Sequence, residues 1–441
     1  MSMGVNNRQR RAAKQRKRAR RGPTPPRRPA GRAGGHDAFF GEEDPVALAL
    51  GVVDMLLTRS VRRLARGRSD ATAAVEHARS LRASLAPLQD EYLDLAVTDL
   101  LDRIVEAVVG AGWGPDDLGE LVRRHGRTGA LPVLAAILHA HAGRHAWASG
   151  SWRARLDELG PVNSVAVGTD EGLASCLAVA ALLADLPPVP PTSTPPGARA
   201  ATAKPAPTTD HRRLATVRAL LAKAESTSYD EEAEALSAKA QELVSRYALA
   251  RALQHTDGPE GRRGADAPVG ARRLWLDPPY VRAKAQLVHE VALANRCRSA
   301  VVEQLGFCSL VGDPADLDAV ELLVTSLLVQ AGSAMLRHGR QLGPGGRSRT
   351  RSFRQAFLLA YAARIGERLR ESDRQVARDA DPTQRLLPAL RDQEARVADA
   401  FAAMVPGAVE TTTEISNGDG WAAGQVAADL ALIDVHGKVT A

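Results

Sequence analysis

Six arginines that lie close together are the strongest candidates for a binding function in this sequence. They fall within residues 337–354, a stretch without Asp or Glu: Arg337, Arg340, Arg347, Arg349, Arg351 and Arg354. Glycines are interspersed with them, and glycine lets a backbone approach a ligand closely. The guanidinium group suits bidentate phosphate binding, and the amides near Ser352, where a helix is expected to begin, would add partial positive charge. The pattern predicts phosphate or nucleic-acid contact, with a flexible, solvated surface loop as the alternative.

Two further features bear on nucleic-acid binding. Phe353 and Phe357 are the only aromatic residues near these arginines, so a base-stacking platform for single strands is weakly supported. Residues 1–35 hold twelve of the 58 basic residues and no acid, leaving 46 basic against 51 acidic groups in the rest of the chain. Such a segment cannot bury enough apolar surface to fold, and we expect a disordered tail. It would bind DNA or RNA phosphates without reading sequence, or act as a solubilising extension.

Metal and carboxylate chemistry are less well supported. His141 and His145 stand at i, i+4 and could bind zinc with His139, but Gly143 weakens the helix and no further ligand lies nearby in sequence. A second group of potential ligands is acidic: Asp313, Asp316, Asp318 and Glu321. Helix capping and the helix dipole already explain the first two, and a nuclease-like second acidic motif is missing. We therefore expect neither a metal site nor a cofactor.

The sequence lacks the defining motifs of several enzyme classes. Gly343–Gly346 lacks the G-K-[ST] ending of a phosphate-binding P-loop, and the sequence contains no G-x-S-x-G nucleophile elbow. ATPase and α/β-hydrolase functions are thereby excluded. The cysteines, Cys176, Cys297 and Cys308, form no C-x-x-C and are expected to be buried apolar residues.

The elements that must position these residues are predicted to be mainly helical. In 441 residues, long enough for two or three domains, 44% are hydrophobic but only 4% aromatic, which favours cores of Leu, Val and Ala in packed helices. Apolar periodicity predicts an N-terminal helical domain over residues 44–186. Its expected helices are Val46–Leu57, Thr72–Leu85, Glu91–Val109, Pro115–His125, Leu131–His145 and Glu171–Asp185, with one short extended segment at Pro161–Val167. Residues 187–210 contain eight prolines and are expected to form an extended linker.

Residues 211–253 are predicted to form an αα-hairpin. Leu214, Val217 and Leu221 recur at helical spacing in its first half. The second half repeats the pattern with Leu236, Ala240, Leu243, Val244 and Tyr247. Between the halves, Ser228 and Glu231 have the spacing of a capping box, so the second helix should begin near residue 229 or 230.

The same hairpin resembles a known family. The strings Leu221–Thr227, Glu232–Leu236 and Ala238–Leu243 are similar to the bacterial and phage family called domain of unknown function 2786, densely over about forty residues. The region from about Val281 looks like the companion domain that often follows. The resemblance implies a helical hairpin and a bacterial or phage setting, but no catalytic residues. Some members carry a metallopeptidase-like domain, whereas the nearest string here, His289–Asn295, lacks the second His of HExxH.

After a flexible joint at residues 254–278, residues 279–441 are predicted to form an α+β domain. Short β-rich runs at Ser299–Val302 and Phe307–Val311 suit a hairpin, and Val409–Ile415 could add the third strand of a small antiparallel sheet. Asp313 before Pro314 is typical of a helix start, and that helix should run to about Met335. The remaining expected helices are Tyr280–Ala294, Ser352–Arg374, Leu387–Met404 and Gly420–Ile433.

The sequence as a whole predicts a mostly α protein with a small antiparallel sheet in its C-terminal α+β domain. No apolar run approaches the length of a membrane span and no apolar segment follows the first arginines, so we expect a cytoplasmic protein without membrane contact. The leading hypothesis is a nucleic-acid-associated binding or adaptor protein that contacts DNA or RNA through the tail and the arginines. The hairpin would then bind a protein partner. Two alternatives remain: an enzyme, perhaps a hydrolase acting on nucleic acid or protein, and a purely protein-binding regulator.

Overall fold

The computed structural model describes most of the chain between residues 45 and 429. The described residues are 45–66, 71–86, 90–126, 129–144, 150–160, 167–192, 208–226, 236, 239–240, 242–247, 269–343, 346–380, 387–409 and 417–429. Residues 49–441 form one compact unit and residues 1–48 another, of which only residues 45–48, at the start of the first described helix, are described. The predicted tail at residues 1–35 thus lies outside the described residues.

The first part of the compact unit is helical, as predicted. Its described helices are α2 (Pro45–Arg66), α3 (Ala71–Leu85), α4 (Asp90–Gly110), α5 (Pro115–His125), α6 (Ala130–Arg144), α7 (Gly150–Asp157) and α8 (Asp170–Leu183). Only α7 was not predicted, and it carries the buried Trp152 into the core. Leu, Val and Ala side chains dominate that core, as the low aromatic content requires. The extended segment predicted at residues 161–167 lies almost wholly outside the described residues.

Local signals explain where two of these helices begin. Pro115 occupies the first turn of α5, and Asp116 and Asp117 follow it at the positive end of the helix dipole. In α8 the hydroxyl of Thr169 accepts a hydrogen bond from the amide of Gly172 at 3.0 Å, which is the usual N-cap contact. These signals act within a few residues, so they are readable from sequence.

A three-stranded antiparallel sheet lies in the second part of the chain, with strand order β1-β3-β2. The strands are β1 (Gly270–Trp275), β2 (Arg298–Val302) and β3 (Phe307–Gly312). The predicted hairpin is therefore confirmed as β2–β3, with Val302 paired to Phe307. The third described strand is β1, which pairs Trp275 with Phe307 and lies inside the segment expected to be a flexible joint. That expectation is wrong for residues 270–275, while residues 410–416, which hold most of the other predicted strand, lie outside the described residues.

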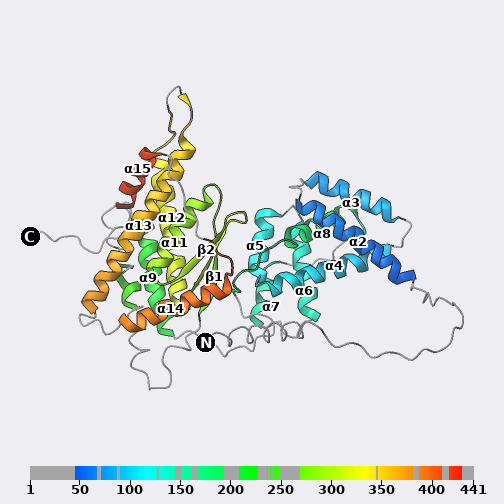
Figure 1. Ribbon diagram of the computed structural model, residues 1–441, viewed down its shortest axis with the longest axis horizontal. Coiled ribbons are helices and arrows are strands. Elements are labelled where there is room, and N and C mark those ends of the chain that lie inside the picture. The colour runs from blue at the N-terminus through cyan, green and yellow to red at the C-terminus, as the bar shows by residue number, and fades with distance from the viewer. Residues whose placement is uncertain are drawn as a thin grey trace, which may run out of the picture. The chain divides into compact units, whose positions relative to one another are not determined.

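Helices pack on this sheet and on each other (Figure 1). They are α11 (Val281–Ala294), α12 (Pro314–Arg337), α13 (Thr350–Ala380), α14 (Leu387–Met404) and α15 (Gly418–Asp429). Helix α11 contacts β2 and β3, α12 contacts β1 and β3, and α13 packs against α11. Helix α15 approaches α13 closely because Gly420 and Gly424 face its backbone. A Cβ atom on Gly424 would lie 2.2 Å from the carbonyl oxygen of Phe357. The mostly α fold with a small sheet is thus confirmed.

Strand β3 is buried on both faces. Cys308 and Leu310 pack into the core formed with α11 and α12, whereas Phe307, which points to the other face, joins the core of the N-terminal helices. Phe307 meets the ring of Trp113 edge-on at a centroid distance of 5.6 Å. The sheet is therefore the layer that links the two cores.

The predicted αα-hairpin is described for its first helix and the end of its second. Helix α9 (Thr208–Ser226) forms the first half, and residues 242–247 are helical in the second. Four residues of the predicted apolar stripe are buried: Val217, Leu221, Ala240 and Val244 form a small core with Ala319 of α12, while the other four are half-buried. The proposed capping box at Ser228 and Glu231 lies outside the described residues.

Helix α12 is long and apolar enough to pass a length and hydropathy criterion for membrane spans. Its position argues against such a role, because α9, α11, α13 and the sheet all pack against it and Leu317, Val320 and Leu323 are buried. Its apolar side chains are used to build the core of this fold.

Candidate functional site

The arginine-rich stretch runs from the end of α12 into the start of α13. The residues between the two helices, 338–349, are here called the arginine loop and are described except for residues 344 and 345. Leu342 and Ser348 form an isolated antiparallel β-bridge. The amide of Gly343 donates to the carbonyl oxygen of Arg347 at 2.8 Å, and the amide of Arg349 donates to that of Gln341 at 2.9 Å. The loop is thus a short two-stranded ribbon, and it projects beyond the helices that flank it (Figure 1).

The base of the ribbon is fixed by side-chain hydrogen bonds. The backbone amide of Gln341 donates to the hydroxyl of Thr350 at 3.0 Å, and the side-chain amide of Gln341 donates to the carbonyl oxygen of His338 at 2.6 Å. The His338 ring lies 5.5 Å from that of Phe353 and 5.6 Å from that of Phe357. These contacts tie both ends of the loop to α13.

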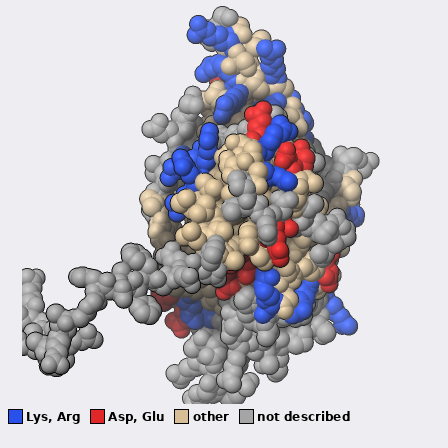
Figure 2. Space-filling model, turned by 90° about the vertical axis from the view of Figure 1, so that its right-hand side faces the viewer, with Lys and Arg blue, Asp and Glu red and all other residues tan. Residues whose placement is uncertain are grey.

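The six predicted arginines are gathered at this end of the molecule. Five are exposed and Arg354 is half-buried. Figure 2 shows several Lys and Arg side chains among uncharged residues on the projecting part of the surface. Within the described residues none of the six forms an ion pair with a carboxylate. Other arginines do: Arg124, for example, pairs with Glu120 at 2.7 Å. The arginine loop is therefore a cluster of cationic groups that the described part of the chain leaves uncompensated.

The helix amides that the sequence predicted to add partial positive charge lie at the base of the arginine loop. Helix α13 begins at Thr350, and α15 begins close by, where the side chain of Asn417 accepts a hydrogen bond from the amide of Gly420 at 2.9 Å. The Asn417 side chain in turn donates to the hydroxyl of Ser352 at 3.4 Å. Two helix N-termini, each with partial positive charge, thus add to the arginine charges.

The aromatic residues near the arginines cannot stack on bases. Phe353 is 4% exposed and Phe357 is fully buried, both in the core beneath the loop. The weak support for a single-strand platform therefore disappears, because a base must reach a ring face to stack on it.

The carboxylates considered for metal chemistry have separate structural roles. Asp313 caps α12, its carboxylate accepting from the amide of Ala315 at 3.0 Å. Asp316 is buried beside Arg296 and accepts a hydrogen bond from Gln393 at 2.9 Å. Asp318 and Glu321 both pair with Arg272 of β1. The four groups do not converge, and the described residues contain no cluster of metal-ligating side chains.

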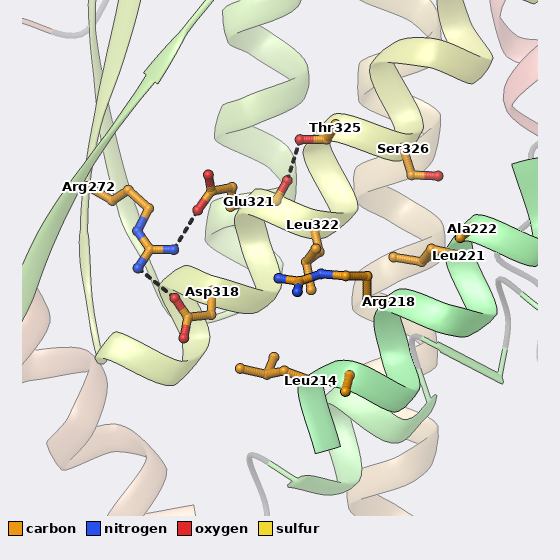
Figure 3. A pocket seen from close by; sticks show the side chains of 11 residues that line it. Leu214, Arg218, Leu221, Ala222, Arg272, Asp318, Glu321, Leu322, Thr325 and Ser326 are labelled. Atoms are coloured by element: carbon orange, nitrogen blue, oxygen red, sulfur yellow. Dashed lines mark hydrogen bonds and ion pairs between the residues drawn. The ribbon is translucent and has the colours of Figure 1, made fainter. Parts of the chain in front are cut away.

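Asp318, Glu321 and Arg272 lie in a cavity of about 480 Å³ between α9, α12 and β1 (Figure 3). Arg272 extends from the strand and contacts Asp318 at 2.6 Å. Across the cavity, Arg218 extends from α9 toward Leu322. The cavity lies between the first helix of the hairpin and the sheet. Its lining contains two arginines and two carboxylates, so the charges largely cancel.

Of the predicted histidine cluster, His141 contacts two carboxylates of α4. His141 is completely buried, and its Nδ1 lies 2.7 Å from a carboxylate oxygen of Asp102 on α4. Its Nε2 lies 3.3 Å from the carboxylate of Glu106. Arg144 also donates to Asp102. Burial by itself would raise the pKa of Asp102, but the hydrogen bonds from His141 and Arg144 and their charges lower it overall. These side chains join α4 to α6, while His145 lies outside the described residues.

The three cysteines are free and buried, as predicted. Burial raises the pKa of the Cys176 and Cys308 thiols to about 12. Because the thiolate is the reactive form, neither is suited to nucleophilic chemistry at neutral pH.

A buried ion pair was not foreseen from sequence. Arg273 of β1 pairs with Asp117 of α5, and their side chains are 1% and 7% exposed. The guanidinium also lies 4.7 Å above the ring of Trp113 and donates to the carbonyl oxygen of Pro190 at 3.1 Å. Burial lowers the pKa of Arg273, against the opposing effect of Asp117. No motif could reveal this pair, since its members are far apart in the sequence.

Comparison with known proteins adds one match. No curated protein and no solved structure matches the chain. A family model described as "Protein of unknown function (DUF2786)" matches residues 212–251, the segment in which the hairpin packs its apolar stripe on α12. The resemblance found in the sequence is thus confirmed for the hairpin, whose residues 212–251 match the model of the DUF2786 family.

Proposed function

We propose that this protein is a cytoplasmic nucleic-acid-associated binding or adaptor protein whose arginine loop contacts the phosphate backbone. The observation that carries the proposal is the set of six arginines on the arginine loop and the adjoining ends of α12 and α13, none with a described carboxylate partner. Phosphate oxygens accept bidentate, charge-assisted hydrogen bonds from guanidinium groups, so they would compensate this charge well.

The ordered ribbon supports binding more than a solvated loop would. Its hydrogen bonds join Gln341 and Gly343 to the strand that leads into Thr350, so these residues lose less conformational entropy when a ligand binds. A flexible loop of the same composition would lose more. The N-termini of α13 and α15 contribute partial positive charge in the same region.

The hairpin would serve as the interaction module in this proposal. Its apolar stripe is already buried against Ala319, so a partner would meet its other side, where Arg212, Thr216 and Lys223 are exposed. Such a contact would be polar and would add to nucleic-acid binding without replacing it.

The test compares two variants of the full-length chain that lose the same charge. One changes Arg340, Arg347 and Arg349 of the arginine loop and Arg351 in the first turn of α13 to Gln. The other changes four exposed arginines of α2 that have no described ion-pair partner: Arg59, Arg62, Arg63 and Arg66. Affinity for labelled duplex and single-stranded probes is measured by fluorescence anisotropy over a range of salt concentrations.

The loop variant should bind more weakly, and the slope of log affinity against log salt should flatten by roughly 0.7–0.9 for each phosphate that the protein no longer neutralises. The α2 variant should stay close to the unmodified protein. The predicted basic tail is present in both variants and so cancels in the comparison. Equal decreases in affinity would show that only diffuse charge matters, and an unmodified protein that binds no probe at low salt would refute the proposal.

A further inference from the structure

The two faces of the arginine loop differ in chemistry. Leu342 and Ser348 are bridge partners, so their side chains share one face of the ribbon. Arg347 and Arg349 are neighbours of Ser348 on its strand and so point to the opposite face. The packing agrees with this, because the side chain of Arg349 lies across Gly343, where a Cβ atom would come within 2.4 Å of its Cδ.

The face away from Arg347 and Arg349 is small and partly apolar. Leu342 is 60% exposed although it stands on a loop otherwise rich in Arg and Gly. Ser348 donates its hydroxyl proton to Thr350 at 3.3 Å, which leaves its oxygen free to accept a hydrogen bond from a ligand. This face offers an apolar contact and a hydrogen-bond acceptor side by side.

A ribbon of this shape fits one groove of nucleic acid better than the others. The major groove of B-form DNA is about 12 Å wide and admits a two-stranded β-ribbon, whereas the minor groove is about half as wide. The major groove of A-form RNA is deep and too narrow for side chains to read. Single strands are disfavoured, since Phe353 and Phe357 are buried.

We propose that the Leu342–Ser348 face of the arginine loop enters the major groove of B-form duplex DNA, where Leu342 contacts thymine methyl groups and the arginines reach the flanking phosphates. This inference rests on the proposed function and specifies its ligand. Thymine presents a methyl group in the major groove that uracil lacks, and apolar side chains recognise that methyl group. Ser348 would accept from amino groups on neighbouring base edges.

The experiment uses the full-length chain and three duplex probes of equal length at one salt concentration. They are an alternating adenine–thymine DNA duplex, the same DNA duplex with uracil in place of thymine, and an alternating adenine–uracil RNA duplex. The thymine duplex should bind best, by about three- to fourfold over the uracil DNA for each methyl group buried, and the RNA duplex least.

Two variants identify the side chain responsible. Leu342→Ala should abolish the difference between thymine and uracil DNA while keeping most of the binding to both. Leu336→Ala, which removes an equally exposed leucine from the last turn of α12, should keep the difference. Both leucines are exposed, so neither change should affect folding.

The outcomes separate the two proposals. Equal binding of all three duplexes, or a thymine preference that survives Leu342→Ala, would overturn the major-groove inference while phosphate binding by the arginines stands. Failure to bind any probe at low salt would overturn both.

Discussion

At the scale of single residues, the side chains with the largest expected effect on stability are buried charges. The side chains of Arg273 and Asp117 are almost completely shielded from solvent, and each neutralises the charge of the other. Thr192 supplies a further hydrogen bond to Asp117 at 3.1 Å, and the rings of Trp113 and Phe307 lie beneath the guanidinium. Removing one charge would leave the other buried without a counter-charge, which costs far more than breaking an exposed pair.

Asp117→Ala should therefore lower the free energy of unfolding by about 3–5 kcal/mol, as measured by urea denaturation. Adding Arg273→Met should recover much of that decrease, because the second change removes the uncompensated cation. Asp54→Ala breaks the exposed pair with Arg103 and should cost at most about 1 kcal/mol. If Asp117→Ala is no more destabilising than Asp54→Ala, the buried pair is not the stabilising contact described above.

A second residue-scale prediction concerns pH. The pKa of Asp102 is lower in the folded protein than its ordinary value, so the native state favours the ionised carboxylate. This contribution to stability is present above the unfolded-state pKa, about 3.9, and is lost as pH falls through the lower folded-state value. Asp102→Asn should lower the melting temperature at neutral pH, and the difference should shrink in acid.

The matched control is Asp99→Asn on the same helix, where the carboxylate is 70% exposed. Its melting temperature should stay close to that of the unmodified protein across the same pH range. A difference for Asp102→Asn that does not change with pH would mean that the amide disturbs packing and that the charge contacts are unimportant.

At the scale of elements, the hairpin is held by its apolar stripe. Val217 is fully buried and Leu221 is 5% exposed against α12, while Ala219 on the same helix is exposed. The isolated hairpin would have little to stabilise it, since short helices are marginal in water and gain most of their stability from packing. The DUF2786 segment should therefore depend on its contact with α12.

Leu221→Asp should release α9 from α12, because burying an unpaired carboxylate costs several kcal/mol. Amide hydrogen exchange along residues 212–226 should accelerate. Ala219→Asp places the same carboxylate on the exposed side and should leave exchange nearly unchanged. Equal acceleration in both variants would show that Leu221 does not lie on the buried side of α9.

At the scale of the whole molecule, charge is unevenly distributed. Residues 1–35 hold twelve basic residues and no acid, whereas the rest of the chain has more acidic than basic groups. The long-range cationic field thus comes from one end of the chain, and the arginine loop is a local exception on the folded surface. The two should contribute to nucleic-acid binding in different ways.

Deletion of Met1–Gly35 should leave the melting temperature nearly unchanged and weaken binding to all nucleic acids alike, because cationic side chains neutralise phosphates without reading bases. Anisotropy titrations and thermal unfolding of the shortened chain measure both effects. A clear drop in melting temperature would show that this segment packs on the fold.

The sequence by itself determined the features that depend on neighbouring residues. Periodic apolar positions located the helices and the hairpin stripe, Asp313 before Pro314 located the start of α12, and the arginine loop was visible as a run of one residue type. Strand β1 was missed because Arg272 and Arg273 interrupt its apolar pattern. Only the tertiary structure supplies the carboxylates that neutralise those arginines: Asp318 and Glu321 for the half-buried Arg272, and Asp117 for the buried Arg273. Likewise, the structure alone decided that Phe353 and Phe357 are core residues and that Arg347 and Arg349 lie on one strand of a bridged loop, since burial and pairing depend on how the folded chain packs.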